Sequence, residues 1–265
     1  MNITVSPPRR ADWASLTALL VVAFADDPFL PVVRRRITLA TFCPFAFLRL
    51  RLIGDVSLLR INGETVGFAI VKYLPDHEAH LWYMAVKREH RSQGLGSHLL
   101  EHALGRAARA GYKTVKLETE EGSPAVRLYQ RHGFAVTGHL HLLAVPLHRP
   151  VAAAPLPTSP ASPFAIAGDA LWRLLLGIRS RTLALPGGGA ATVNDYGGDN
   201  LVVFVQRQSR PTLAFYKEVA ESFGGIAPPG RKAILVVFSD AAAELLKAEY
   251  GFTAYKTYTT MSCTF

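Results

Sequence analysis

The chain has 265 residues, the length of one large domain or two smaller ones, and its 49% hydrophobic and 18% charged residues exclude a disordered protein. Its net charge of +9 would suit a nucleic-acid partner, but the basic residues are dispersed apart from Arg34, Arg35 and Arg36, which favours a solvated basic surface. Two cysteines, an N-terminus without signal-peptide layout and apolar stretches too short to span a bilayer lead us to expect a cytoplasmic protein that does not enter the membrane.

The N-terminal part predicts a short strand over residues 3–5 and then a helix. Asp12 can cap this helix, and its apolar residues follow helical spacing: Trp13, Leu16, Leu20 and Phe24. Pro28 disfavours helix just before itself and so ends it. Residues 30–52, rich in Phe and Leu, predict one or two further helices.

A hairpin follows, because residues 56–60 and 65–73 have strand character and the Asn62-Gly63 pair between them tolerates the positive φ of a tight turn. The apolar run over residues 81–86 predicts the next strand. The strand leads into a glycine-containing loop.

That loop, Arg91-x-x-Gly94-x-Gly96, precedes an amphipathic helical pattern over residues 97–110. A strand, a glycine loop and a helix N-terminus together form an anion site, because backbone N–H groups point outward and the helix dipole favours negative charge. The spacing matches neither the nucleotide loop G-x-x-x-x-G-K-[ST] nor the dinucleotide loop G-x-G-x-x-G. A plain strand-to-helix turn is the alternative.

The succession continues with a strand over residues 114–119, a helix over 123–132, Gly133-Phe134 and a further strand. With the loop residues Arg91, Gln93, Gly94 and Gly96 and the later Tyr129-x-x-x-Gly133-Phe134, residues 1–148 resemble the GNAT superfamily of acetyltransferases. The resemblance implies an α/β (α+β) fold with a mixed, mostly antiparallel sheet flanked by helices. It also implies acetyl-CoA as the acyl donor and a primary amine of a small molecule or peptide as the acceptor.

The resemblance also assigns roles to residues. Tyr129 matches the proton donor to the departing thiolate, and Phe24, Asp27 and Phe29 are candidate lining residues of the acceptor site. The residues expected to bind acetyl-CoA are Met84, Ala85, Val86, Arg91, Ser92, Gln93, Gly94, Leu95, Gly96, Ser97, Ser123, Ala125 and Tyr129. At position 123 the family often has Asn, so the contact made by Ser123 stays open.

The general base is less clearly marked. Glu118 lies late in the second central strand, near the point where the two central strands should separate, and is our choice. Glu120, His80, His139 and His141 remain alternatives, the two last sharing one face of a strand.

His98-x-x-Glu101-His102 has the spacing of a zinc-peptidase signature. These residues lie on the polar side of the predicted helix, and no third ligand is marked out downstream. We therefore interpret them as a solvated helix surface and expect no metal.

Residues 149–163 alternate prolines with Ala, Ser and Thr, which predicts a semi-extended linker. Residues 164–265 then repeat the order strand, helix, strand, helix, Gly-Phe, strand, which predicts a second, degenerate GNAT-like domain. The copy lacks the loop glycines, has Lys247 in place of Tyr129, and contains none of the nine histidines. We expect a non-catalytic partner domain, within a pseudo-dimeric monomer or a homodimer.

One part of the first domain is left open. A GNAT domain usually closes with a final hairpin, but only residues 143–147 remain before the linker, so the last strand is either these residues or a strand from the second half. The competing functions are a non-catalytic acyl-CoA-binding or regulatory module and, third, a basic nucleic-acid-binding protein.

Overall fold

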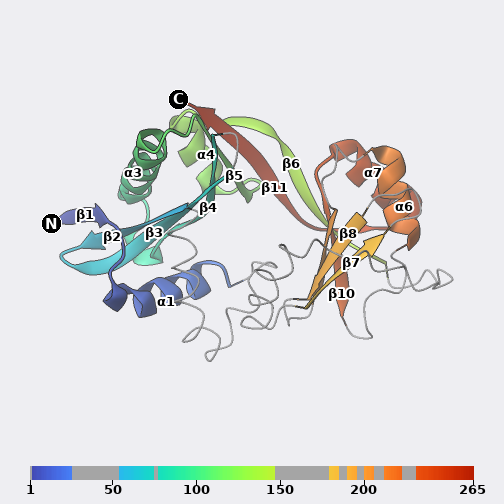
Figure 1. Cartoon of the computed structure of the whole chain (residues 1–265), viewed down its shortest axis with the longest axis horizontal. Helices are drawn as coiled ribbons and strands as arrows, with labels where there is room; N and C mark the ends of the chain where they lie inside the picture. The colour runs from blue at the N-terminus through green and yellow to red at the C-terminus, as the bar shows by residue number, and fades with distance from the viewer. Residues whose placement is uncertain are drawn as a thin grey trace. The chain divides into compact units, whose positions relative to one another are not determined.

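The structure is a computed structural model and describes residues 2–25, 54–74, 77–146, 179–184, 190–195, 200–205, 212–222 and 231–265. The chain divides into two compact units (Figure 1). Among the described residues, unit 1 contains 2–25, 54–137 and 259–265, and unit 2 contains 138–258. The helices predicted over residues 30–52 lie outside the described residues, as do Asp27, Phe29 and the predicted linker.

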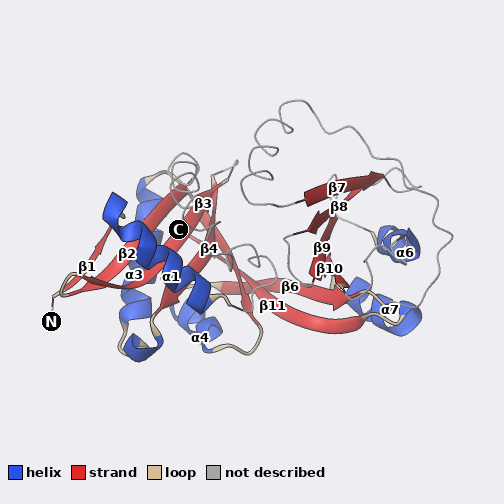
Figure 2. Ribbon diagram, turned by 90° about the horizontal axis from the view of Figure 1, so that it is seen from below, coloured by secondary structure: helices blue, strands red, loops and turns tan. Residues whose placement is uncertain are grey.

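Unit 1 is a twisted sheet with helices on both faces. Its strands run in the order β1-β2-β3-β4-β5-β11-β6. The elements of the first half that build it are β1 (Ile3–Ser6), α1 (Trp13–Ala23), β2 (Gly54–Ile61), β3 (Glu64–Tyr73), β4 (Glu78–Val86), α3 (Leu95–Arg109), β5 (Thr114–Glu120), α4 (Pro124–Arg131) and β6 (Ala135–Ala144). Helix α1 covers one face of the sheet, and α3 and α4 cover the other (Figure 2). Within the described residues of this part of the chain, the predicted elements are confirmed within a few residues.

The hairpin between β2 and β3 turns at the predicted pair. Asn62 has φ +49° and Gly63 has φ +88°, the left-handed conformations that a tight two-residue hairpin turn requires. Glu64 pairs with Ile61 directly after the turn, so the turn sets the register of both strands.

Asp12 immediately precedes α1, as predicted, but its carboxylate makes no capping bond to the helix. Instead Oδ2 accepts hydrogen bonds from the Arg9 backbone N–H at 2.5 Å and from the Arg60 guanidinium at 2.6 Å. The bond to Arg60 ties the start of α1 to β2. A partly buried arginine on the neighbouring strand therefore takes the carboxylate that sequence alone assigned to the helix.

The main core of unit 1 lies between the sheet and α3. The buried side of α3 includes Leu99 and Leu100, each 0% exposed, and packs on Val115 and Leu117 of β5. Strand β5 alternates buried and exposed residues in the order expected for a strand with one covered face. Truncating either leucine to alanine would remove about 2–5 kcal/mol of stability.

Strands β4 and β5 are parallel neighbours that separate. They pair only from Glu78–Thr114 to His80–Lys116, and beyond that point each continues without pairing to the other. We call the place where they part the β4–β5 fork. On its other edge, β4 stays paired to β3 as far as Val86, with a register shift that leaves Trp82 as an extra residue.

Unit 2 repeats the plan of unit 1 on a smaller scale. Its strands run in the order β7-β8-β9-β10-β6-β11, and β9 and β10 are parallel, as β4 and β5 are. Helices α6 and α7 lie side by side (Figure 1). The elements of the second half are β7 (Arg179–Ala184), β8 (Ala190–Asp195), β9 (Asn200–Val205), α6 (Leu213–Ser222), β10 (Lys232–Val237), α7 (Asp240–Tyr250) and β11 (Thr253–Thr264).

The strand that completes unit 1 comes from the end of the chain. β11 lies between β5 and β6, and Met261, 1% exposed, and Cys263 belong to the core cluster under α3. The Thr137 hydroxyl lies 3.2 Å from that of Thr260, and the Phe265 N–H donates to the Lys113 carbonyl at 3.0 Å. Of the two alternatives left open by the sequence, the structure selects the strand contributed by the second half.

Unit 2 receives a strand in return. β6 pairs antiparallel with β10, from Ala144–Ile234 to His141–Val237, and Leu143 is 1% exposed within the core cluster of unit 2. Each half of the sequence thus ends in a strand that completes the other half's sheet. The compact units therefore differ from the predicted domains 1–148 and 164–265 in the residues of these exchanged strands, β6 and β11.

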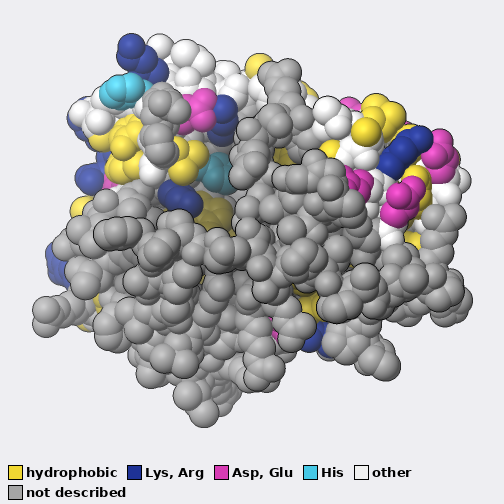
Figure 3. Space-filling view, turned by 45° about the vertical axis from the view of Figure 1, so that its right-hand side comes forward, with side chains coloured by type: hydrophobic (Ala, Val, Ile, Leu, Met, Phe, Trp, Pro, Cys, Tyr) yellow, Lys and Arg dark blue, Asp and Glu magenta, His cyan; other side chains and the backbone are white. Residues whose placement is uncertain are grey.

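No helix in the described ranges combines the length and the apolar character needed to cross a bilayer. In the described part of the face shown in Figure 3, Lys and Arg side chains are interspersed with hydrophobic and acidic ones.

Candidate functional site

The loop between β4 and α3 has the backbone geometry of an anion site. Ser92 has φ +60° and Gly94 has φ +76°, and Gly94 is the residue that precedes α3. A β-carbon built on Gly94 would meet no atom within 4 Å, so the space beside this glycine is open. Arg91, Ser92, Gln93 and Gly94 are all exposed. A left-handed residue followed by a helix start turns successive amides to one side.

The amides at the start of α3 are available to a ligand. The first hydrogen bond of the helix runs from the His98 N–H to the Gly94 carbonyl at 3.1 Å, so the N–H groups of Leu95, Gly96 and Ser97 precede the intrahelical ladder. Arg91 adds a cation, and its Nε donates to the Val86 carbonyl at 3.0 Å, which fixes the guanidinium at the end of β4. The predicted loop residues are therefore brought together as expected of a phosphate site.

Gly96 has a packing role that sequence reasoning missed. A β-carbon at this position would lie 3.3 Å from Cδ2 of Leu128 on α4. Gly96 therefore allows the start of α3 to approach α4 closely, whereas the open, left-handed position is Gly94.

Tyr129 lies on α4 within the core of unit 1. Its side chain is 7% exposed and packs edge-to-face on Phe134 with ring centroids 5.6 Å apart. Burial raises the pKa of Tyr129 to about 12, so the hydroxyl is protonated throughout the physiological range. Tyr129 can therefore donate a hydrogen bond to an anion but cannot serve as a base.

The remaining predicted cofactor residues border the β4–β5 fork. Met84 and Val86 pack on the core under α3, and beyond His80 the edge of β4 that faces away from β3 pairs with no strand among the described residues. Ser123 precedes α4, and its hydroxyl lies 3.2 Å from that of Thr119 on β5. Ala125 packs on the same core from the first turn of α4.

Glu118 on β5 forms a pair with His80 on β4, at the place where the two strands part. Glu118 Oε2 lies 2.6 Å from His80 Nε2, and the two side chains are 32% and 24% exposed. The residues before and after His80, and those before and after Glu118, point toward α3. His80 and Glu118 themselves therefore point to the opposite face of the sheet. The base chosen from the sequence, Glu118, and one of the alternatives, His80, are thus joined in one pair.

The face that carries this pair also carries α1. Phe24 at the end of α1 packs on Tyr83 and Phe68, with ring centroids 4.8 Å and 6.3 Å apart. Phe24 thus lies on the same face as His80 and Glu118, as a wall of an acceptor site would. The other two predicted wall residues, Asp27 and Phe29, lie outside the described residues.

The zinc-peptidase spacing in α3 does not form a metal cluster. Within the described ranges, the residues found close enough to hold a metal ion are His139, His141 and Asp240. Glu101 instead lies 3.3 Å from His132 Nε2, and His98 is exposed.

Asp240, the first residue of α7, is the group that sequence reasoning missed. Its Oδ1 lies 2.6 Å from His141 Nε2 and 3.3 Å from His139 Nδ1. The hydrogen bond from His141 lowers the pKa of Asp240. In unit 2, Lys247, which stands where Tyr129 stands in the first half, forms an ion pair with Glu244 at 2.8 Å.

The arrangement in unit 1 can do acyl-transfer chemistry. Anion-binding amides and a protonated phenol lie on the α3–α4 side of the sheet, and a His–Glu pair lies on the α1 side. The β4–β5 fork is the place where the sheet is open between the two faces. A reactant bound along the unpaired edge of β4 would therefore have access to both sets of groups.

Comparison with known proteins agrees with this description. Residues 28–134 match the sequence profile of the acetyltransferase (GNAT) family. Over 74 residues the chain is 38% identical to the ribosomal protein bS18-alanine N-acetyltransferase of Escherichia coli K12, a match covering 28% of this chain and 49% of that enzyme. The chain thus spans about half the length of the curated relatives it matches.

Two solved structures share the fold along nearly the whole chain. A tandem GNAT protein from the clavulanic acid biosynthesis pathway superposes with a TM-score of 0.64 at 14% identity, covering 99% of this chain and 98% of that one. A GCN5-related N-acetyltransferase from Sphaerobacter thermophilus gives 0.61 at 16% identity, covering 99% and 95%. At these identities the likeness concerns the fold. Residues 28–134 thus match the acetyltransferase (GNAT) family, and along its length the chain shares the fold of a tandem GNAT protein.

Proposed function

We propose that the chain is an N-acetyltransferase that takes an acetyl group from acetyl-CoA and transfers it to a primary amine. The observation that carries the proposal is the loop Arg91–Ser97, whose left-handed Ser92 and Gly94 lead into the free amides of α3 next to the β4–β5 fork. The family match of residues 28–134 supports the same chemistry.

The loop fits the pyrophosphate of coenzyme A. Helix-start amides, the guanidinium of Arg91 and the open space beside Gly94 supply donors and room for a doubly charged group. The unpaired edge of β4 at Met84, Ala85 and Val86 offers main-chain groups to an extended pantetheine arm. One of these N–H groups would polarise the thioester carbonyl as its oxygen gains charge.

The His80–Glu118 pair is suited to remove the amine proton. A carboxylate only accepts hydrogen bonds, so Nε2 of His80 donates to Glu118 and Nδ1 carries the lone pair. In this arrangement His80 takes the proton from the ammonium group or the attacking amine, and Glu118 orients the ring and stabilises the imidazolium. Glu118, the base chosen from the sequence, then acts through His80.

Tyr129 would act where the thiolate departs. Burial raises the pKa of the Tyr129 phenol from the ordinary value of about 10 to about 12. At that pKa the phenol is a weaker acid than a thiol, so complete proton transfer to the departing thiolate is uphill. Tyr129 therefore stabilises the leaving sulfur chiefly by donating a hydrogen bond to it.

The proposal leaves the acceptor as a primary amine of a small molecule or a peptide. The E. coli relative is named as an N-acetyltransferase of an alanine in ribosomal protein bS18. A peptide alanine offers a primary amine only where it begins the peptide, so peptides that begin with alanine belong in a panel of acceptors. The panel would also contain amino acids, polyamines and aminoglycosides.

The panel is assayed with acetyl-CoA by release of free thiol, with the acetylated product identified by mass spectrometry. Tyr129→Phe serves as the matched variant. We expect at least one amine to be acetylated by the wild-type chain and much more slowly by the variant. Tight binding of acetyl-CoA without transfer to any amine would instead favour the non-catalytic acyl-CoA-binding module.

A further inference from the structure

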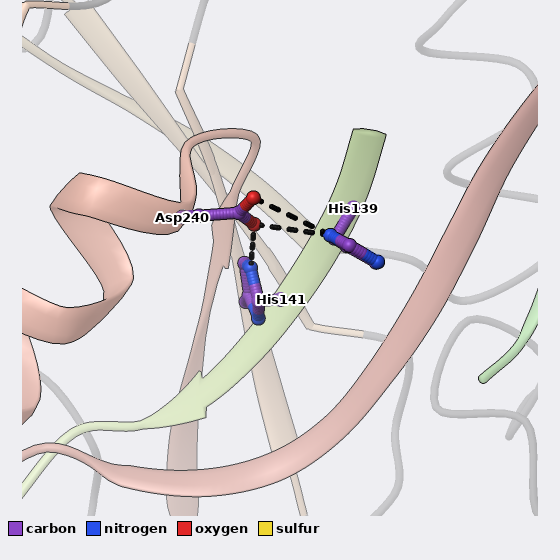
Figure 4. A group of neighbouring side chains, drawn as sticks. All are labelled: His139, His141 and Asp240. Carbon is purple, nitrogen blue, oxygen red and sulfur yellow. Dashed lines mark hydrogen bonds and ion pairs between the residues drawn. The ribbon is translucent and has the colours of Figure 1, made fainter. Parts of the chain in front are cut away.

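We propose that His139, His141 and Asp240 form a binding site for a borderline divalent metal ion, of which Zn²⁺ is the clearest example. All three residues belong to unit 2, and their ligand atoms lie within 4.8 Å of one another (Figure 4). The site does not depend on the acetyl-transfer activity proposed for unit 1.

The sheet register brings the three residues together. His139 and His141 are two positions apart on β6, so their side chains share one face. His141 pairs with Val237, the last residue of the antiparallel β10, and the chain then turns through Phe238 and Ser239 into α7. Because the strands are antiparallel, residues beyond Val237 lie beside residues that precede His141, which places Asp240 next to both histidines.

The cap of α7 leaves the Asp240 carboxylate available. Ser239 is the capping residue, and its hydroxyl accepts the Ala242 N–H at 3.3 Å. Asp240 can therefore direct both oxygens toward the histidine rings, as Figure 4 shows. Oδ1 lies 2.6 Å from His141 Nε2, and Oδ2 lies 3.4 Å from His139 Nδ1.

These separations suit one metal ion. Zinc binds imidazole nitrogen and carboxylate oxygen at about 2.0–2.2 Å, so ligand atoms around a tetrahedral zinc lie about 3.4 Å apart. The distances from Asp240 to His139 already have this value, and the contact to His141 needs to open by less than about 1 Å. Two imidazoles and one carboxylate form a donor set for a borderline metal, because imidazole suits Zn²⁺, Cu²⁺, Ni²⁺ and Fe²⁺ better than Ca²⁺ or Mg²⁺.

The surroundings support a bound ion with an accessible face. His141 is 8% exposed, so packing fixes the position of its ring. The Thr257 hydroxyl lies 3.5 Å from the other ring nitrogen, Nδ1. In a metal-binding histidine, a hydrogen-bonding partner on one ring nitrogen fixes the tautomer in which the other nitrogen can bind the metal. For His141 that metal-binding nitrogen is Nε2. The Asp240 side chain is 63% exposed, which leaves a coordination position open to water or another ligand.

The site is tested by titrating the full chain, purified without a polyhistidine tag and stripped with a chelator, with ZnCl₂ in a calorimeter at pH 7.5. We expect one Zn²⁺ per chain, and a cobalt-loaded sample with the visible absorption of a site that has fewer than six ligands. Changing a residue that only hydrogen-bonds a metal ligand weakens metal binding about 10–100-fold. Asp240→Asn replaces an oxygen of a ligand itself and removes its negative charge, so it should weaken Zn²⁺ binding at least about tenfold.

The matched control is His77→Asn, since His77 is exposed, is absent from the cluster, and has φ +57°, which Asn tolerates. It should bind Zn²⁺ as the wild type does. Asp240 is exposed, so Asp240→Asn is expected to keep the fold, which circular dichroism checks. His141→Gln provides a second, buried variant. One-to-one binding that survives both Asp240→Asn and His141→Gln, or no saturable binding by the wild type, would overturn the proposal.

Discussion

Replacing Met261 by alanine tests whether the last strand of the chain supports the unit that contains the Arg91–Ser97 loop. Met261 belongs to β11, is 1% exposed, and packs in the same core cluster as Leu99 and Leu117. The truncation removes three heavy atoms from a closely packed site, and such changes lower the free energy of unfolding by about 2–5 kcal/mol. Because Met261 is almost completely buried, we expect about 3 kcal/mol.

The assay is urea unfolding followed by tryptophan fluorescence, since Trp13 and Trp82 both belong to unit 1. The matched control is Thr264→Ala, which alters an exposed side chain of the same strand and should change the unfolding free energy by no more than about 0.5 kcal/mol. If Met261→Ala is as stable as Thr264→Ala, β11 does not complete the sheet of unit 1 and the exchanged-strand description is wrong.

Three further predictions concern the fragment, the phenol and the proposed base. Residues 1–148 expressed alone should aggregate or unfold at lower temperature than the full chain, because they lack β11; a monomeric fragment as active as the whole chain would contradict this. Tyr129→Phe should lower kcat about 100-fold with little change in acetyl-CoA affinity. The folded-state pKa of about 12 exceeds the unfolded value of about 10, so wild-type stability should fall by about 3 kcal/mol at most as pH rises from 10 to 12, and a pH series should show that Tyr129→Phe lacks this fall. His80→Gln and Glu118→Gln should each reduce kcat/KM for the amine, and the double variant should lose little more than either single one, whereas additive losses would mean that the pair does not act as a unit.

Local chemistry made most of the fold predictable. The Asn62-Gly63 turn, the strand–loop–helix around Gly94 and the second-half elements around Gly251-Phe252 all appear close to their predicted bounds, because turn residues and hydrophobic period determine them locally. The source of the strand beside β5 was not predictable. β11 and β5 are separated by more than 130 positions in the sequence, and the residue pattern of 253–264 does not indicate which sheet this strand joins.

In the candidate site, too, some residues are placed by their local sequence and others by the pairing of distant strands. The loop residues carry their geometry in their own sequence, so Arg91 and Gly94 could be selected without coordinates. The pairing of His80 with Glu118 depends on the register of β4 on β5, and that of His141 with Asp240 depends on the register of β6 on β10. The pKa of Tyr129 is raised by burial in the core of unit 1, which depends on how the chain packs and not on the residue alone.

The proposed function depends most on acetyl-CoA binding at the Arg91–Ser97 loop, and calorimetric titration of acetyl-CoA into three proteins tests this directly. Gly94→Asp places a side chain and a negative charge in the open space next to the helix-start amides. Gly111→Asp is the matched control, because Gly111 also has positive φ, +87°, and open space around it, but lies beyond the other end of α3. We predict that the wild type and Gly111→Asp bind acetyl-CoA alike and that Gly94→Asp binds at least about 100-fold more weakly, a loss of about 2.7 kcal/mol. Equal affinities of Gly94→Asp and Gly111→Asp would contradict the assignment of this loop as the coenzyme site.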